Sequence, residues 1–536
     1  MPDDLIGSRY ALEGRVVTMN DSLDVLERGI IYIDAGHITA VQDESEPPAP
    51  EFADAPLVRT GGTIYPGLIE LHNHLSYNVL PFWEVPTRFM NRGDWRSLSS
   101  YKQSVSRLMA LLATVDGSAA AIARYVESKC LLSGVTTSQG IRFISNQGIV
   151  RDYPGLVRNA ESPDDPNLPK ARTRVSDVTP ADVQHVFEDQ NECECYLLHL
   201  CEGVDADTHK YFDVFHLQNG EWAITKSLSG IHSICLTKED FNLLKTRDAS
   251  VIWSPLSNHL LYGDTMDIAA AKSSQVTIGI GSDWSPSGSK NLLCELKVAR
   301  LVSQNRNNVF TDAELVSMAT RNAARILGWQ DRLGSIEKGK LADLLVLHGR
   351  QGDPYAKLLT SRETTIILVV IGGVPRCGQE RLMKKFKLET EAWTVGRSKR
   401  ALHLENLQPD ALPEHLTLAE AKNLLRENLL ALPQLASDLE NAPPATLHAL
   451  RSGAQERWTV VLDLEGEDES RLFNLASSDL LAPEVRAFGA PVPLSQLIQP
   501  IELDEITVVD DRRYFDRLGT QINLPEFIKS GLPELY

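Results

Sequence analysis

Apolar, strand-like runs alternate with helix-like segments from about residue 66 to residue 332. Residues 195–199 (CYLLH) have the pattern of a short buried strand, whereas Ser118 to Leu132 and Asp312 to Leu327 have the spacing of helices. Such alternation is typical of parallel strands covered by helices, in either a barrel or an open sheet, and a (β/α)8 barrel needs about 250 residues. We therefore predict the α/β class, with a (β/α)8 TIM barrel over residues 66–332.

Segments rich in β-branched residues flank this region on both sides. The sequences GRVVTM and GIIYIDAGHITAVQ lie before residue 65, and ADLLVLHG and TTIILVVIGGVP follow residue 333. We expect residues 1–65 and 333–377 to form one small composite β-sandwich domain. Residues 378–536 combine a helical pattern (LTLAEAKNLLRENLLALPQLASDL) with a strand-like one (WTVVLDLEG), which predicts an extra α+β C-terminal module. This module is a candidate for a lid or for a homo-oligomer contact.

The charge and cysteine content restrict the partners of the chain. The 72 acidic residues outnumber the 53 Lys and Arg residues and give a formal net charge of −19, which argues against nucleic acid or an anionic membrane as partner. The strongest apolar run, 366–374, is too short to span a bilayer, and the N-terminus lacks a signal-peptide pattern. Seven cysteines, an odd number, favour reduced thiols. We expect a cytoplasmic protein that acts on a small molecule.

Side chains that bind metal ions stand at the ends of several predicted strands. His72 and His74 in ELHNHLS end one strand and, because a strand repeats every two residues, point to the same side. His199 ends CYLLH, His232 ends LSGIH and Asp283 follows VTIGIGS. The carboxyl ends of barrel strands meet at one face, where barrel active sites lie. Imidazoles and a carboxylate gathered there predict a site for zinc, iron or manganese.

Six motifs occur in a fixed order along the chain. They are PGLIELHNH (66–74), HLCEG (199–203), GIH (230–232), SPLSN (254–258), GSD (281–283) and LGSIEKGKLAD (333–343). Together they resemble the amidohydrolase superfamily of metal-dependent hydrolases, and within it the cytosine/guanine-deaminase and triazine-hydrolase branch. The resemblance covers roughly residues 10–375 and does not reach residues 378–536.

The resemblance implies four ligands for one divalent metal ion: His72, His74, His199 and Asp283. Zn²⁺ is the expected ion, with Fe²⁺ and Mn²⁺ as alternatives. Binuclear members of the family add a carboxylated lysine on a strand that precedes the first single histidine. Between residues 135 and 198 the sequence has one lysine, Lys170, within the loop-like NLPKART. We therefore predict a single ion.

The resemblance also implies catalytic roles for three residues. Asp283 would accept a proton from the attacking water, and Glu202, in the HxxE pattern after His199, is similar to the glutamate with which deaminases protonate a ring nitrogen and the leaving group. His232 would polarise the reacting centre. The predicted reaction is hydrolysis of a carbon–nitrogen bond other than a peptide bond, namely deamination of an aminated N-heterocycle.

Two other activities remain open for the same ligand set. One is hydrolysis of a cyclic amide, which resembles the imidazolonepropionase reaction, or displacement of another leaving group from a heterocycle. The other, from a different class, is a non-catalytic scaffold that descends from such enzymes. Every expected ligand is present in the sequence, which argues against the scaffold.

Five further residues near the predicted strand ends are candidates for substrate contacts. Trp83 and Arg88 follow the HxH strand in a segment that could cover the site, Arg142 follows another strand, Asn258 is placed at the end of a strand SPLSN, and Trp284 follows Asp283. Aromatic and guanidinium faces suit a flat or anionic substrate. Packing and surface charge explain these side chains equally well.

Overall fold

The structure is a computed structural model that describes residues 9–406, 410, 412–443, 456–465, 486–487 and 490–536 of the 536-residue chain. Eight short parallel strands form its centre, in one sheet of three strands and one of five. In chain order they are β5 (Leu68–Glu70), β6 (Val135–Ser138), β9 (Arg158–Asn159), β10 (Ala171–Arg174), β11 (Cys195–Leu200), β12 (Leu228–His232), β13 (Ser250–Trp253) and β14 (Thr277–Ile280).

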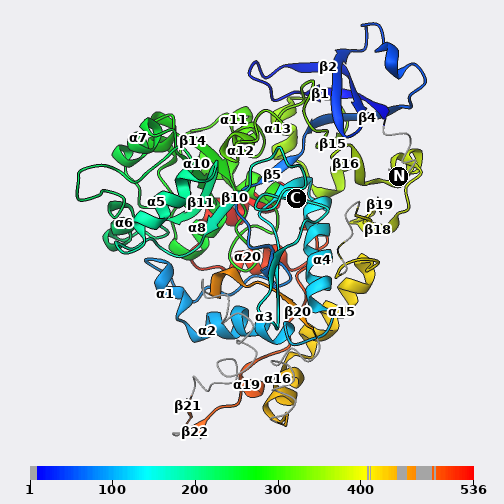
Figure 1. The fold of residues 1–536 in the computed structure, drawn as a ribbon. Helices are drawn as coiled ribbons and strands as arrows, with labels where there is room; N and C mark the ends of the chain where they lie inside the picture. The colour runs from blue at the N-terminus through cyan, green and yellow to red at the C-terminus, as the bar shows by residue number, and fades with distance from the viewer. Residues whose placement is uncertain (1–8, 407–409, 411, 444–455, 466–485, 488–489) are drawn as a thin grey trace.

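Backbone hydrogen bonds join the two parallel sheets at both ends. Ala171 N of β10 donates to Ala160 O, directly after β9, at 2.9 Å. On the other side, Asp283 N donates to His72 O at 2.9 Å, and His74 N donates to Asp283 O at 2.7 Å. The eight strands therefore follow one another in chain order through backbone hydrogen bonds, and the predicted parallel α/β architecture is confirmed (Figure 1).

Helices surround these strands (Figure 1), and most of them connect one strand to the next. They are α4 (Ser118–Leu132), α5 (Val183–Asn191), α6 (Ala206–Asp213), α7 (Lys238–Thr246), α8 (Pro255–Tyr262), α9 (Ile268–Ser273), α10 (Leu292–Asn305), α11 (Asp312–Met318), α12 (Arg321–Ile326) and α13 (Pro354–Leu359). The segment after β5 contains α1 (Arg92–Arg96), α2 (Ser99–Tyr101) and α3 (Arg107–Leu112).

Two predictions of secondary structure were wrong in detail. The helix expected over 312–327 is interrupted between α11 and α12, where Thr320 adopts φ −133° and ψ −99°. Asn258 lies in helix α8 instead of ending a strand, because Pro255 occupies the first turn of that helix, a position that suits its fixed φ.

A nine-stranded sheet combines strands from both flanks of the central region. Its order is β18 (Glu391–Val395), β19 (Ser398–Leu402), β17 (Val374–Gln379), β16 (Ile366–Ile371), β15 (Leu344–His348), β4 (Leu57–Pro66), β1 (Arg9–Val17), β2 (Val25–Asp34) and β3 (His37–Asp43). Figure 1 shows its N-terminal strands at the upper right, apart from the parallel strands. The flanks meet where β4 pairs with β15, with Tyr65 opposite Leu345.

The nine-stranded sheet continues beyond the border expected at residue 377. Cys377 pairs with Leu402, so β18 and β19 extend the sheet although they belong to the segment predicted as a separate module. Other C-terminal elements are α14 (Glu380–Met383), α15 (Leu418–Leu430), α16 (Leu432–Glu440), β20 (Trp458–Val460), β21 (Arg486–Ala487), β22 (Ala490–Pro491), α19 (Leu494–Leu497), α20 (Tyr514–Thr520) and α21 (Glu526–Glu534). The exact domain borders stay predictions.

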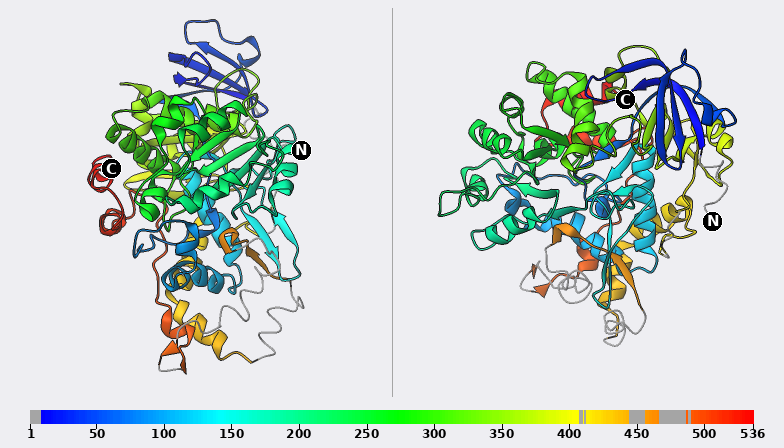
Figure 2. Two further views of the ribbon diagram at one scale, coloured as in Figure 1. Left: turned by 90° about the vertical axis from the view of Figure 1, so that its left-hand side faces the viewer. Right: turned by 45° about the horizontal axis from the view of Figure 1, so that its top comes forward.

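The end of the chain packs on the central region. Figure 2 shows the red C-terminal helices beside the green helices that surround the strands. Lys297 of α10 places its ammonium 4.6 Å from the ring centroid of Tyr536, and Gln521 donates to the backbone oxygen of Trp83 at 3.3 Å. The C-terminal helices and the residues that follow them thus contact both helix α10 and the segment that follows β5.

The structure also bears on the cysteines and on membrane-spanning helices. All seven cysteines are free thiols, which agrees with the absence of a disulfide framework predicted from their number. No helix in the described part of the chain combines the length and the apolar character that crossing a bilayer requires.

A buried ion cluster ties the C-terminal segment to the central region. Lys129 of α4 and Lys290 place their ammonium groups 2.7 Å and 2.5 Å from the carboxylate of Asp504, and Lys290 also lies 3.0 Å from Asp511. Burial lowers the pKa of Lys129 to about 8, although Asp504 acts in the opposite direction. Removing the carboxylate would leave two buried ammonium groups without their main counter-charge.

We expect Asp504→Ala to lower the free energy of unfolding by about 3–5 kcal/mol, because breaking a buried ion pair leaves an uncompensated charge. Thermal and urea unfolding would measure this loss. Asp516→Ala, which removes an exposed carboxylate on α20, is the matched control and should unfold like the parent protein. Equal stability of the two variants would show that the cluster does not hold the C-terminal segment in place.

Candidate metal centre and active site

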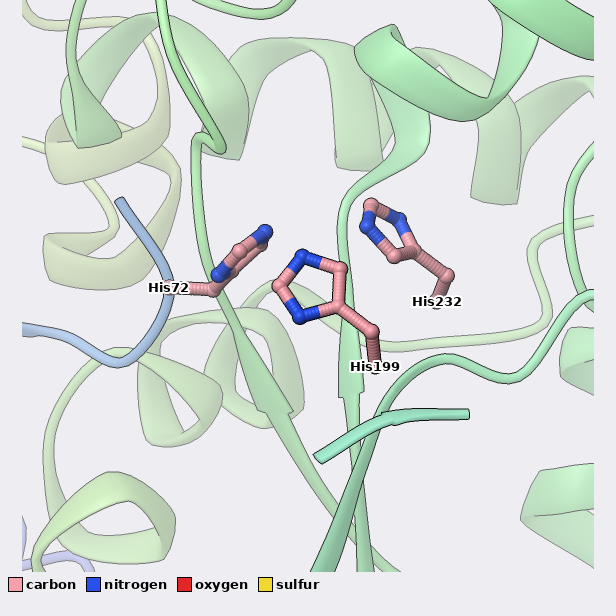
Figure 3. A group of neighbouring side chains, drawn as sticks. All are labelled: His72, His199 and His232. Carbon is pink, nitrogen blue, oxygen red and sulfur yellow. The ribbon is translucent and has the colours of Figure 1, made fainter. Parts of the chain in front are cut away.

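Five residues predicted as ligands or catalytic groups come together at the carboxyl ends of four strands. His72 and His74 follow β5, His199 lies in β11, His232 ends β12 and Asp283 follows β14. Two groups of three residues could each hold a metal ion, namely His72–His74–Asp283 and His72–His199–His232. Within each group, the ligand atoms all lie within 4.8 Å of one another. Figure 3 shows His72, His199 and His232 gathered around a common space, with the rings of His72 and His199 4.7 Å apart between centroids.

Asp283 joins the two histidines of the HxH motif. Its Oδ1 lies 3.2 Å from Nε2 of His72 and 3.5 Å from Nε2 of His74, and its Oδ2 accepts a hydrogen bond of 2.5 Å from Ser257. Asp283 and His232 both have left-handed backbone conformations, each with φ of 66°. Such conformations are costly for residues with side chains and cluster at functional sites.

Each of three histidines has an oxygen acceptor at its Nδ1 atom. Nδ1 of His72 lies 3.0 Å from Gln139 Oε1, and Nδ1 of His232 lies 2.9 Å from Asn258 Oδ1. Nδ1 of His74 lies 2.6 Å from Asp463 Oδ2. Because an amide or carboxylate oxygen accepts, Nδ1 carries the proton and Nε2 keeps its lone pair. This is the arrangement by which partners of metal-binding histidines fix both the tautomer and the ring orientation.

The surroundings of the cluster lower the pKa values of His72, His199 and Asp283 but raise that of His74. Burial lowers the pKa of His72, and burial together with the neighbouring imidazoles lowers the pKa of His199 well below its ordinary value. Burial would raise the pKa of Asp283, but the surrounding histidines hold it below the usual range. The pKa of His74 is raised, because the carboxylates of Asp463 and Asp283 outweigh the effect of burial. An ionised Asp283 beside neutral imidazoles is suited to a cation.

The ligand set fits one divalent ion of the zinc class. Nε2 of His72 is buried and makes no hydrogen bond to the described residues, although it points toward the other ligand groups. Three imidazoles and one carboxylate are donors that zinc accepts in proteins. We therefore expect a cation to satisfy this nitrogen together with His74, His199 and Asp283.

Glu202 lies next to the histidine cluster. It is buried, Tyr262 donates a hydrogen bond of 2.6 Å to its Oε1, and its Oε2 is 3.8 Å from Nε2 of His232. Arg92 places its Nε 4.0 Å from the same oxygen. A buried carboxylate that accepts one hydrogen bond and lies beside an imidazole and a guanidinium is suited to general acid–base chemistry.

Two predicted substrate contacts, Trp83 and Trp284, belong to a buried aromatic cluster. Trp284 meets the ring of His74 edge-on at 6.1 Å and donates to Ser287 at 2.6 Å. Trp83 packs edge-on against Tyr101 at 5.6 Å. Trp284 therefore contacts a predicted metal ligand, whereas Trp83 contacts other rings of the aromatic cluster, and a substrate contact for either ring stays a prediction.

The other three predicted contacts lie in different surroundings. Arg88 is exposed and donates to the backbone oxygen of Tyr262 at 2.6 Å, whereas Asn258 orients His232. Arg142 begins β7 (Arg142–Ser145) and lines a cavity of about 300 Å³, which also includes Asn73, Gln139, Glu161, Thr173 and Asp463. Of these three side chains, Arg142 is therefore the one beside an open space at the strand ends, and its substrate contact also stays a prediction.

A larger cavity of about 710 Å³ lies at the opposite end of the strands. Its lining includes Ser250 and Thr277, the first residues of β13 and β14, together with Glu194, which precedes β11. Because the five clustered residues are at the carboxyl ends, this larger cavity is not part of the metal centre.

Several residues of the site were not found from the sequence. Ser257 and Tyr262 lie in and just after the SPLSN motif, so their proximity to Asn258 was a usable signal. Gln139 follows the strand SGVTTS and could have been singled out as another polar strand end. Asp463 is 389 positions away from His74, and no pattern in the sequence connects the two.

Comparisons with known proteins find similarity to hydrolases of one family. The sequence profile of the Amidohydrolase family matches residues 202–375. An S-triazine hydrolase of Gordonia rubripertincta is 30% identical over 124 residues, which are 22% of this chain and 26% of that protein. The chain thus matches about a quarter of the length of this curated relative. A 5-methylthioadenosine/S-adenosylhomocysteine deaminase of Symbiobacterium thermophilum is 23% identical over 406 residues, 68% of this chain and 90% of that enzyme.

Solved structures show the same fold. An adenosine deaminase from Xanthomonas campestris with bound zinc superposes with a TM-score of 0.54 and 20% sequence identity, over 70% of this chain and 97% of that one. The profile match starts at Glu202 and includes His232 and Asp283. The chain is similar to the amidohydrolase superfamily, with deaminases and a triazine hydrolase among its relatives.

Proposed function

We propose that this protein is a metal-dependent hydrolase that deaminates an aminated N-heterocycle. The observation that carries the proposal is the position of Glu202, whose buried carboxylate lies 3.8 Å from Nε2 of His232 beside the predicted metal ligands. A proton donor at this place suits a reaction in which a ring nitrogen and then an amino group must be protonated. Deaminases among the relatives support this choice.

A single divalent ion, with Zn²⁺ as first choice and Fe²⁺ or Mn²⁺ as alternatives, is proposed for His72, His74, His199 and Asp283. Bound there, the ion would lower the pKa of a water molecule from 15.7 to about 7 and so supply hydroxide at neutral pH. Lys170, the lysine considered for a bridging role, is exposed in the loop before β10, which supports one ion instead of two.

The protein groups would then move protons and hold the substrate. Asp283 accepts a proton from the attacking water at its carboxylate, and Ser257 keeps that carboxylate in place through its 2.5 Å hydrogen bond. Glu202 donates a proton to the ring nitrogen, takes up the proton of the newly added hydroxyl group and passes it to the departing amino group, so that water and the C–NH₂ group yield C=O and ammonia. The proton held by Asp283 then returns to Glu202. His232, with its proton fixed on Nδ1 by Asn258, directs Nε2 toward the reacting centre.

The ring of eight parallel strands is proposed to be the (β/α)8 barrel expected from the sequence. Support comes from the hydrogen bonds that link β9 to β10 and β14 to β5 and from the position of all five clustered residues at the carboxyl ends. The nine-stranded sheet would be the β-domain built from both flanks, and the described segment 456–465 of the C-terminal module would cover part of the site.

Displacement of a group other than ammonia is the second candidate function. The similarity to an S-triazine hydrolase favours it, because the same ligands could serve reactions that differ in the leaving group. Hydrolysis of a cyclic amide is a related alternative. The three reactions give different products from a common site.

An ammonia-release screen separates these functions. The metal-loaded protein would be incubated with aminated purines, pyrimidines, pterins and triazines and, in parallel, with cyclic ureides and halogenated triazines. We expect ammonia from at least one aminated heterocycle and none from the His72→Ala variant. Turnover confined to ring opening or to halide release would contradict deamination and favour the second candidate.

A further inference from the structure

A short C-terminal segment, residues 456–465, reaches the metal centre from outside the region that resembles the family. Its strand β20 pairs antiparallel with β7, with Trp458 opposite Ser145 and Val460 opposite Phe143. Val461 N continues the pairing by donating to Arg142 O at 2.8 Å. The segment is therefore attached by backbone hydrogen bonds to an element at the mouth of the strand ring.

The residues after β20 are held on their other side as well. Arg96 of α1 donates to the backbone oxygen of Leu464 at 2.5 Å, so contacts at Val461 and Leu464 enclose Asp463. This aspartate begins a short 3-10 helix, Asp463–Glu465. Anchors on both sides restrict where its carboxylate can lie.

The carboxylate of Asp463 contacts a predicted metal ligand. Its Oδ2 is 2.6 Å from Nδ1 of His74, which is fully buried between the strand ends and the segment. The side chain of Asp463 is 40% exposed and also lines the 300 Å³ cavity that includes Arg142 and Glu161. Asp463 therefore lies between that cavity and the metal centre.

The other histidines show what such an acceptor does. The acceptors at Nδ1 of His72 and His232 are Gln139 and Asn258, and both belong to the central region. For His74 the corresponding acceptor comes from residue 463, and a carboxylate forms a shorter and stronger hydrogen bond to an imidazole N–H than an amide does. With its proton held on Nδ1, His74 directs Nε2 toward Asp283, 3.5 Å away.

We propose that Asp463 is a positioning residue through which the C-terminal module orients His74 for metal binding. The affinity of the centre then depends on a segment outside the catalytic region, and the same segment forms one wall of the adjacent cavity. This inference rests on the proposed function of the histidine cluster as a metal site. It gives the C-terminal module a definite role.

The test compares Asp463→Ala, Asp463→Asn and His74→Ala in the full-length protein. Zinc affinity would be measured by competition with a chromophoric chelator, and kcat and KM would be measured separately at saturating zinc. We expect Asp463→Ala to weaken zinc binding about 10–100-fold, as for other partners of metal-bound histidines. Asp463→Asn should restore most of the affinity, because its side-chain oxygen still accepts from Nδ1.

Matched controls make each outcome decisive. Glu456→Gln, at an exposed carboxylate of the same segment, should leave zinc affinity unchanged, and unfolding temperatures identify any variant that fails to fold. If Asp463→Ala binds zinc like the parent protein while His74→Ala loses it, the positioning role is wrong and the metal site stands. If His74→Ala also keeps full zinc affinity, the proposed metal site itself is wrong. Equal losses for Asp463→Ala and Asp463→Asn would also contradict orientation through an accepted hydrogen bond.

Discussion

The His72→Ala protein is expected to lose its metal ion and to fall in kcat/KM by roughly 10³-fold or more. His72 belongs to both groups of ligand atoms in the centre, and its buried Nε2 has no hydrogen-bond partner among the described residues. Without the ion, water at neutral pH supplies far less hydroxide. Metal content by elemental analysis and initial rates on the substrate found in the ammonia screen would measure both losses.

A second variant, at a histidine outside the ligand cluster, shows whether the loss of metal and activity is specific to His72. His348 is exposed at the end of β15, far from the ligand cluster in the fold, and His348→Ala should keep one equivalent of metal and full turnover. Full metal content and full turnover in His72→Ala would show that the site has been placed wrongly.

Glu202→Gln is expected to keep its metal ion but to lower kcat by about 10²–10⁴-fold, the usual contribution of general acid–base catalysis. Glutamine occupies nearly the same volume and can still accept the hydrogen bond from Tyr262, but it cannot release a proton to a ring nitrogen or to a leaving amine. Metal analysis together with single-turnover kinetics would distinguish a slow chemical step from weak substrate binding.

Glu239→Gln provides the matched control for this variant. Glu239 is an exposed residue in the first turn of α7, so its replacement should leave both metal content and kcat unchanged. An unchanged kcat for Glu202→Gln would remove the acid–base role from Glu202 and, with it, the main argument for deamination.

The elements that carry the site were predictable because their signals are local. Helix α4 has the predicted bounds, Ser118–Leu132, and strand β12 has the predicted bounds, Leu228–His232. In each case a uniform apolar pattern ends at a clear polar or turn residue. The prediction over 312–327 missed the interruption at Thr320, because the apolar spacing continues through a bend that depends on packing.

The candidate ligands were predictable for a related reason. Histidine or aspartate directly after an apolar strand falls at the same end of every parallel strand, so order along the chain determines proximity in space. The residues that orient these ligands follow no such rule. Gln139 contacts His72 across 67 positions and Asp463 contacts His74 across 389, and each contact depends on how distant segments pack.

The border drawn at residue 377 shows the same limitation. The change from β-branched runs to helical patterns after this residue suggested a new unit, but Cys377 pairs with Leu402 in a sheet that continues into it. Strand pairing joins residues that are distant in sequence, so composition along the chain does not reveal which sheet a later strand extends.

The most direct test of the central claim is an anomalous difference map from crystals of the zinc-loaded protein, recorded on both sides of the zinc absorption edge. The account predicts one peak per chain, about 2.0–2.2 Å from ligand atoms of His72, His74, His199 and Asp283. Two peaks in the cluster, or zinc bound elsewhere with these four side chains uncoordinated, would contradict it.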